Sequence, residues 1–108
     1  MKAQAFVFLA AILLNAHAAA SQEYGDTKAG YAYASQVCSE CHAVQKGQLT
    51  SPHPRAPSFT TVADTPGMNE MALRVWFQSP HPSMPNLNLT EKKGDDLIAY
   101  ILSLKTRK

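Results

Sequence analysis

The sequence predicts an all-α fold of three or four helices, and three observations support that prediction. Apolar residues recur at helical spacing in three stretches, each with a residue suited to capping at its start. No stretch alternates apolar and polar residues for long enough to form a strand. Proline-rich stretches separate the predicted helices, as is typical of loops. With 108 residues, the chain is long enough for one small domain.

The first twenty residues read as a secretory signal peptide. Lys2 gives a positive start, residues 5–14 form an apolar run, and residues 16–20 offer small-residue cleavage sites. This run is too short to span a membrane as a helix, which needs about twenty residues, so an uncleaved anchor is the weaker alternative. We expect cleavage after Ala20, export to the bacterial periplasm, and a mature domain of residues 21–108 without stable membrane insertion.

The first predicted helix begins after a cap at Asp26 or Thr27 and ends at about Val37. Residues 22–26, which precede it, are polar and expected to be loose. Gly30 lies inside the helix, where glycine costs about 1 kcal/mol but lets another helix approach closely.

Residues 43–59 show no helical or strand period and contain three prolines, so a loop is expected there. After a turn at residues 66–67, the second predicted helix covers residues 69–78, with Asn69 or Thr65 as its cap. Its broad apolar face contains Met71, Leu73, Val75, Trp76 and Phe77.

Residues 79–89 again contain three prolines, which make this stretch extended and stiff. Thr90 can cap the last helix, which is predicted from Glu91 to about Lys105. The apolar stripe of this helix contains Leu97, Ile98, Ile101, Leu102 and Leu104.

The only two cysteines stand in the sequence Cys38-Ser39-Glu40-Cys41-His42. C-x-x-C-H is the signature of covalent haem attachment, in which each thiol forms a thioether bond to a haem vinyl group. On a helical turn the two cysteines and the histidine lie at i, i+3 and i+4, hence on one face, and the imidazole can reach the iron. We therefore expect one haem c, bound through Cys38 and Cys41, with His42 as an iron ligand.

Three other uses of the two cysteines are weaker. A thioredoxin-like dithiol needs a strand before its helix, and no such pattern surrounds the motif. A structural zinc site wants four ligands, and no second pair of Cys or His residues follows. A disulfide between Cys38 and Cys41 would close a small, strained ring.

With this motif and the order of the surrounding elements, the chain resembles the small monohaem class I cytochromes c of the bacterial, periplasmic type. The resemblance covers essentially the whole mature chain and implies the class I cytochrome c fold around one covalently attached haem. It also implies that Gly30, which lies eight residues before Cys38, meets the C-terminal helix near Tyr100.

Two further residues are implied by the resemblance. A proline carbonyl in the loop of residues 43–59 accepts the Nδ1 hydrogen of the histidine ligand, with Pro57 as the candidate and Pro54 as the alternative. An aromatic residue in the second helix, here Trp76, packs on the haem or reaches a propionate, although ordinary core packing explains it equally well.

Met84 is the expected sixth ligand of the iron. It lies between Pro82 and Pro85 in a polar loop, where a thioether is unusual because methionine normally fills gaps in a core. The Met-Pro step after a short helix resembles the sixth-ligand loop of the family. His81 is a competing candidate, His53 is weaker still, and Met68 and Met71 are expected to pack.

The resemblance implies a one-electron carrier rather than an enzyme, because an axial His/Met pair fills both iron positions and raises the reduction potential. The expected carrier is monomeric and meets redox partners transiently, such as a dehydrogenase, a cytochrome complex or an oxidase. The alternatives are a haem enzyme or gas-sensing domain with an open or labile sixth site, or the dedicated cytochrome subunit of a dehydrogenase. The mature chain carries nine basic against eight acidic residues and no basic stripe, which argues against nucleic acid as a partner.

Overall fold

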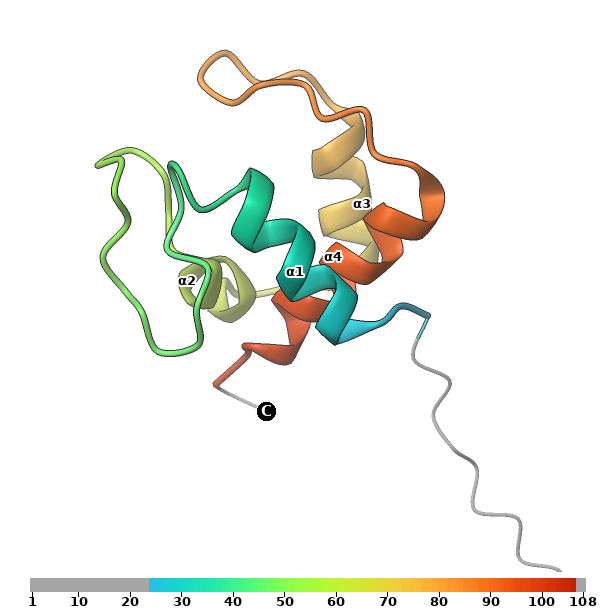
Figure 1. The fold of residues 1–108 in the computed structure, drawn as a ribbon, viewed down its shortest axis with the longest axis horizontal. Helices are drawn as coiled ribbons and strands as arrows, with labels where there is room; N and C mark the ends of the chain where they lie inside the picture. Colours follow the sequence, from blue (N-terminus) through green and yellow to red (C-terminus); the bar gives the residue numbers. More distant parts are fainter. Residues whose placement is uncertain (1–23, 107–108) are drawn as a thin grey trace, which may run out of the picture.

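The computed structural model describes residues 24–106, and in this range the chain forms four α-helices and no strand (Figure 1). The helices are α1 (Thr27–Val37), α2 (Phe59–Asp64), α3 (Glu70–Gln78) and α4 (Glu91–Ser103). None of these four has the length and apolarity needed to cross a membrane. The all-α prediction is therefore confirmed for the described range, while the predicted signal peptide lies outside it.

The caps predicted for three of the helices are present. The side chains of Asp26, Asn69 and Thr90 each accept a hydrogen bond from a backbone N–H in the first turn of α1, α3 and α4, respectively. Such a bond satisfies one of the donors that the start of a helix leaves unpaired. Helix α4 ends at Ser103, slightly before the predicted end at Lys105.

Helix α2 is absent from the prediction, because three of its six residues are β-branched and have low helix propensity. The Ser58 side chain caps it by accepting a hydrogen bond from the backbone N–H of Thr61 at 3.1 Å. Phe59 and Ala63 are buried in the core, and α2 packs against α4. Burial of these side chains thus stabilises a helix that local propensity disfavours.

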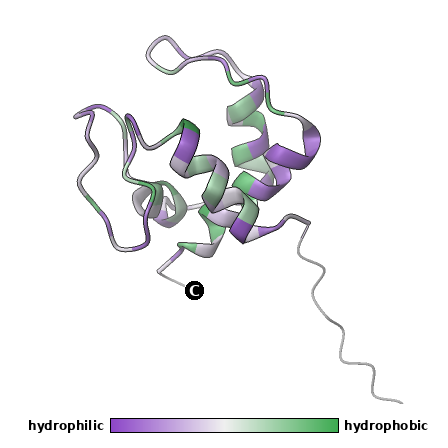
Figure 2. Ribbon diagram, in the orientation of Figure 1, coloured by the Kyte–Doolittle hydropathy of each residue, from purple (hydrophilic) through white to green (hydrophobic). Residues whose placement is uncertain are grey.

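Helix α4 is the central element, since α1, α2 and α3 all pack against it. Its first turns are hydrophilic and its later turns mostly hydrophobic (Figure 2). Leu97, Ile98 and Ile101 on α4 are almost completely buried, together with Ala34 of α1 and Leu73 of α3. The core therefore lies along the second half of α4.

Helices α1 and α4 cross at Gly30. A β-carbon at this position would lie 2.0 Å from the carbonyl oxygen of Asp96 and 2.7 Å from the β-carbon of Tyr100. Only glycine allows the two backbones to approach this closely. The contact between Gly30 and the C-terminal helix near Tyr100 is thus present as expected.

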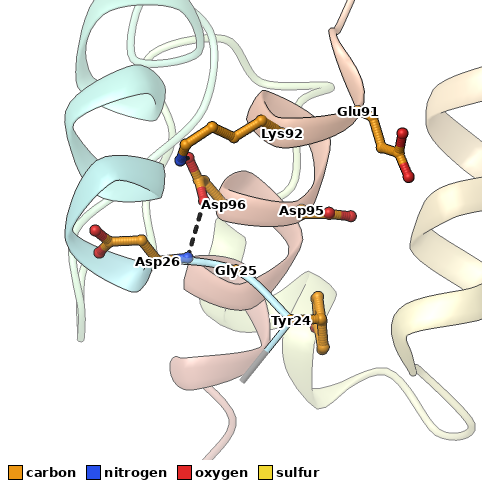
Figure 3. Close-up of a pocket in the computed structure, with 7 residues that line it drawn as sticks. All are labelled: Tyr24, Gly25, Asp26, Glu91, Lys92, Asp95 and Asp96. Carbon is orange, nitrogen blue, oxygen red and sulfur yellow. Dashed lines mark hydrogen bonds and ion pairs between the residues drawn. The ribbon is translucent and has the colours of Figure 1, made fainter. Parts of the chain in front are cut away.

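The residues immediately before α1 pack against α4, so the expectation of a loose segment is wrong for residues 24–26 (Figure 3). The backbone N–H of Asp26 donates a hydrogen bond to the Asp96 carboxylate at 2.9 Å. Gly25 lies so close to the Asp95 carbonyl that a β-carbon would be 2.2 Å from its oxygen. The chain therefore enters α1 in a fixed position on α4.

The buried carboxylate of Asp96 also accepts a hydrogen bond from Lys92 Nζ at 2.7 Å. The Lys92 bond, followed by the bond from the Asp26 backbone, lowers the pKa of Asp96 below its usual value. Both interactions favour the charged form of the carboxyl group, and they outweigh the opposing effect of burial.

We expect Gly30→Ala to destabilise the protein by about 1–3 kcal/mol, because the added methyl group must push α1 away from α4. Urea denaturation measures the change. Gly94→Ala is the matched control within α4, because a β-carbon there meets no atom within 4 Å. Since alanine is the better helix former, the control should be neutral or stabilising by up to about 1 kcal/mol. Equal urea midpoints for the two variants would contradict the close crossing at Gly30.

We expect Asp96→Asn to unfold at lower urea than the wild type at about pH 7, with the difference shrinking towards about pH 3. The pKa of Asp96 is lowered by folding, so its ionisation stabilises the fold above the unfolded-state pKa. That stabilisation is lost as the pH falls through the folded-state pKa. The exposed Glu40, changed to Gln, serves as the control. A difference in urea midpoint between wild type and Asp96→Asn that does not vary with pH would contradict stabilisation by the ionised Asp96 carboxylate.

Candidate functional site

The cysteine motif forms the turn that follows α1 directly. The backbone N–H groups of Cys41 and His42 both donate to the carbonyl oxygen of Cys38, at 3.2 and 2.9 Å. The motif therefore winds as one helical turn, the geometry on which the spacing argument depends. Both cysteines are free thiols rather than partners in a disulfide.

The two thiols differ in their surroundings. Cys38 is buried in the core and Cys41 is exposed. Burial raises the pKa of the Cys38 thiol to about 11, because a thiolate is disfavoured away from water. The Cys38 position therefore suits an uncharged sulfur, which describes both a thiol and a thioether.

The imidazole of His42 is oriented by a hydrogen bond to the following loop. Its Nδ1 lies 2.7 Å from the carbonyl oxygen of Pro57. Because a carbonyl oxygen can only accept, Nδ1 must carry the proton, and in the neutral ring Nε2 is left with a free lone pair. Histidine ligands of metals are commonly held in this way. Pro57 rather than Pro54 is the partner, as the resemblance implies, and its role towards an iron stays a prediction.

Phe59, the first residue of α2, packs beside the imidazole of His42. Their ring centroids are 5.4 Å apart with planes tilted by 52°. The backbone N–H of Phe59 donates to the carbonyl oxygen of Ala43, next to His42 in the chain, at 2.9 Å. Helix α2 thus holds one side of the imidazole, a role that the sequence prediction misses along with the helix.

The loop between the motif and α2 is folded back onto the motif by hydrogen bonds. The backbone N–H of His53 donates to the Cys41 carbonyl at 3.1 Å, and the Ser51 hydroxyl accepts from the Ala43 N–H at 2.9 Å. The buried Tyr100 of α4 donates its hydroxyl hydrogen to the Val44 carbonyl. From the sequence, Tyr100 is expected only at the helix crossing, although a buried tyrosine hydroxyl generally requires a partner.

Met84 lies in the second loop, residues 79–89, which runs from α3 to α4. In Figure 1 this loop and the loop of residues 43–58 project from the helical core with the C-terminal end of α1 between them. Met84 is half-buried and pairs with His81 through an isolated antiparallel backbone bridge. Its role as an iron ligand stays a prediction.

Trp76 of α3 lies against His81 of the same loop. The two rings stack with centroids 3.7 Å apart and planes at 16°. In addition, His81 Nε2 lies 3.0 Å from the Trp76 carbonyl oxygen. This partnership was not predicted, although a tryptophan and a histidine separated by a helix end and one proline are a signal that could have suggested it.

The remaining methionine and histidine candidates have other surroundings. His53 is exposed, and its Nδ1 accepts a hydrogen bond from the Arg55 backbone N–H at 3.1 Å. Met68 packs against the core as predicted. The prediction that Met71 packs is wrong, because its side chain is 68% exposed.

The residues present fit a haem. Two thiols and an imidazole with a free Nε2 share one turn, which is the donor set that covalent attachment requires. Val37, which directly precedes Cys38, is 43% exposed, so an apolar side chain next to the first thiol is accessible to a ligand. Between residues 24 and 106, no group of three His, Cys, Asp or Glu side chains is arranged to hold a metal ion.

Two hollows in the surface lie away from the motif. One of about 540 Å³ is bounded by residues 24–26 and the first turns of α4 (Figure 3). Its carboxylates include Asp95, which is paired with Arg74 at 2.7 Å, and Asp96, which is paired with Lys92. The other, of about 450 Å³, lies between α3, the loop of residues 79–89 and α4. Neither hollow is lined by the cysteines or by His42.

The predicted site residues form two groups. Cys38, Cys41, His42 and Pro57 lie together at the end of α1, whereas Trp76 and Met84 are both in contact with His81.

Comparisons of the chain with protein-family models, with curated proteins and with solved structures return no match.

Proposed function

We propose that this protein is a one-electron carrier with a class I cytochrome c fold, containing one haem c attached through Cys38 and Cys41. His42 and Met84 are the proposed axial ligands. The observation that carries the proposal is the His42–Pro57 hydrogen bond, which leaves Nε2 free on the same turn as two unpaired thiols. This combination is what a covalently attached, histidine-ligated haem requires.

Each residue contributes a distinct property to such a site. Haem, when bound, supplies an iron that alternates between the ferrous and ferric states. The Nδ1–H bond to Pro57 raises the basicity of the His42 imidazole and fixes the plane of its ring. The Met84 thioether is a neutral sulfur ligand, which favours the ferrous state and raises the reduction potential.

The loops around His42 limit how far the imidazole can move. Phe59 packs against its ring, while Ser51 and Tyr100 hold the backbone at Ala43 and Val44, respectively. A ligand that is fixed before the electron arrives needs little rearrangement when the charge changes. The packing around His42 therefore favours fast, reversible electron transfer.

Export and docking complete the proposal. The predicted signal peptide directs the carrier to the periplasm, where it would meet redox partners transiently or serve as the cytochrome subunit of a dehydrogenase. Within residues 79–89 the chain contains no Lys, Arg, Asp or Glu. We infer that this uncharged loop forms part of the surface that a partner contacts, because it can be covered in a small redox interface without burying a charged side chain.

We expect Met84→Ala to remove the far-red sulfur-to-iron charge-transfer band of the ferric protein, to lower the reduction potential and to let carbon monoxide bind the reduced protein. Absorption spectroscopy and redox titration measure these changes. Met71→Ala is the matched control, because Met71 is an exposed methionine outside the loop. An unchanged spectrum in Met84→Ala would exclude this ligand. Ready carbon monoxide binding by the wild type would favour a haem enzyme or gas sensor with an open site.

We expect His42→Ala to yield no stable haem protein, whereas His53→Ala retains one haem per chain. The difference arises because His42 alone has its Nε2 presented beside the two thiols, while His53 is exposed in the loop. Intact mass and the pyridine haemochrome assay on the periplasmic protein count the attached haem. Wild-type mature protein without covalently bound tetrapyrrole would reject the proposed function.

A further inference from the structure

His81 contacts Trp76 of α3 in two ways. Its ring stacks on the Trp76 indole, with centroids 3.7 Å apart and an angle of 16° between the planes. Its Nε2 lies 3.0 Å from the Trp76 carbonyl oxygen, and because a carbonyl can only accept, Nε2–H is the donor. The stack fixes the plane of the imidazole and the hydrogen bond fixes its rotation within that plane.

These contacts lie at the C-terminal end of α3. The last carbonyls of a helix have no partner inside the helix. Here the Trp76 carbonyl also accepts from the Ser79 N–H at 3.2 Å, and the Val75 carbonyl accepts from the Ser79 hydroxyl at 2.7 Å. Ser79 and His81 both belong to the following loop, so the start of that loop is fastened to the helix end.

The connection from His81 to Met84 is short and stiff. The two residues form an antiparallel backbone bridge. Each also precedes a proline, Pro82 and Pro85, and a residue before proline is largely restricted to extended conformations. Proline fixes its own φ as well. Few backbone rotations remain between the imidazole and the thioether, so the position of His81 largely determines that of Met84.

The far end of the loop has its own attachment. Leu89 is partly buried and packs against the core just before α4 begins. Met84 therefore lies between two anchors, Leu89 on the side of α4 and His81 on the side of α3. Of these, only His81 is joined to Met84 by backbone pairing.

We propose that His81 is a positioning residue, which by its stack and hydrogen bond on Trp76 holds the Met84 loop where the thioether can bind the iron. This inference rests on the proposed function, in which Met84 is the sixth ligand. It differs from the earlier hypothesis that His81 competes for the iron, because here its Nε2 is engaged by the Trp76 carbonyl.

The test is the rate at which cyanide displaces the sixth ligand of the ferric haem protein, measured by stopped-flow absorption. We expect His81→Ala to raise this rate by about tenfold, roughly the combined weight of one hydrogen bond and one aromatic stack. His81→Phe keeps a ring on Trp76 without the N–H donor, and His81→Gln keeps a donor without the ring. Both should give intermediate rates, and the far-red band should persist in all three variants.

One control variant and one further measurement separate loop release from other effects. His53→Ala removes a histidine from the other loop and should exchange like the wild type. The urea midpoint of His81→Ala shows whether faster exchange comes with a general loss of stability. A His81→Ala variant that unfolds at lower urea but exchanges at the wild-type rate would show that His81 only caps α3, and would overturn the positioning role.

The two proposals fail in different ways. If Met84→Ala opens the iron while His81→Ala exchanges like His53→Ala, the positioning role is wrong and the carrier proposal stands. If Met84→Ala leaves the far-red band and the cyanide rate unchanged, Met84 is not the sixth ligand and both assignments fall. Loss of the sixth ligand in His81→Ala but not in Met84→Ala would identify His81 as that ligand and would likewise reject the positioning role.

Discussion

The close approach of α1 and α4 at Gly30 is the constraint on which the rest of the molecule depends. Helix α1 ends directly in the cysteine turn, so its seat on α4 decides where Cys38 and His42 lie. Tyr100, which borders the crossing, also donates its hydroxyl hydrogen to Val44 just beyond the motif. One stretch of α4 therefore positions both the helix before the histidine and the loop after it, and Asp96 fixes the entry to α1 from the same stretch.

Local patterns predicted the parts of the fold whose causes are local. Caps and apolar periodicity located α1, α3 and α4 to within a residue or two, because a cap bonds within its own first turn. The sequence pattern does not predict helix α2, because the stability of this helix comes from burying Phe59 rather than from helix propensity. The sequence also does not predict the packing of residues 24–26, because Asp26 forms its hydrogen bond with Asp96, which lies far away in the chain.

In the candidate site, too, only the features with local causes could be predicted from the sequence. The spacing of Cys38, Cys41 and His42 was sufficient to predict a shared turn, since a helical turn sets that geometry by itself. Which proline reaches His42 depends on the path of a long loop, so the resemblance implies a proline partner with Pro57 as candidate and Pro54 as alternative, and the structure shows Pro57. The stack of Trp76 on His81 was not foreseen for a similar reason, because it depends on the path of the chain after α3. Met71 was misjudged because an apolar residue on a helix need not face the core.

The uncharged loop of residues 79–89 has a consequence for the kinetics of encounter. Long-range attraction between proteins depends on fixed charges, and salt at about 0.1 M screens it beyond about 10 Å. A partner that docks on this loop, as proposed for the carrier, meets fixed charges only at its edges, where Arg74 and Glu91 border the adjacent hollow. If the protein is the proposed electron carrier, salt would then change its association rate through those flanking charges rather than through the loop itself.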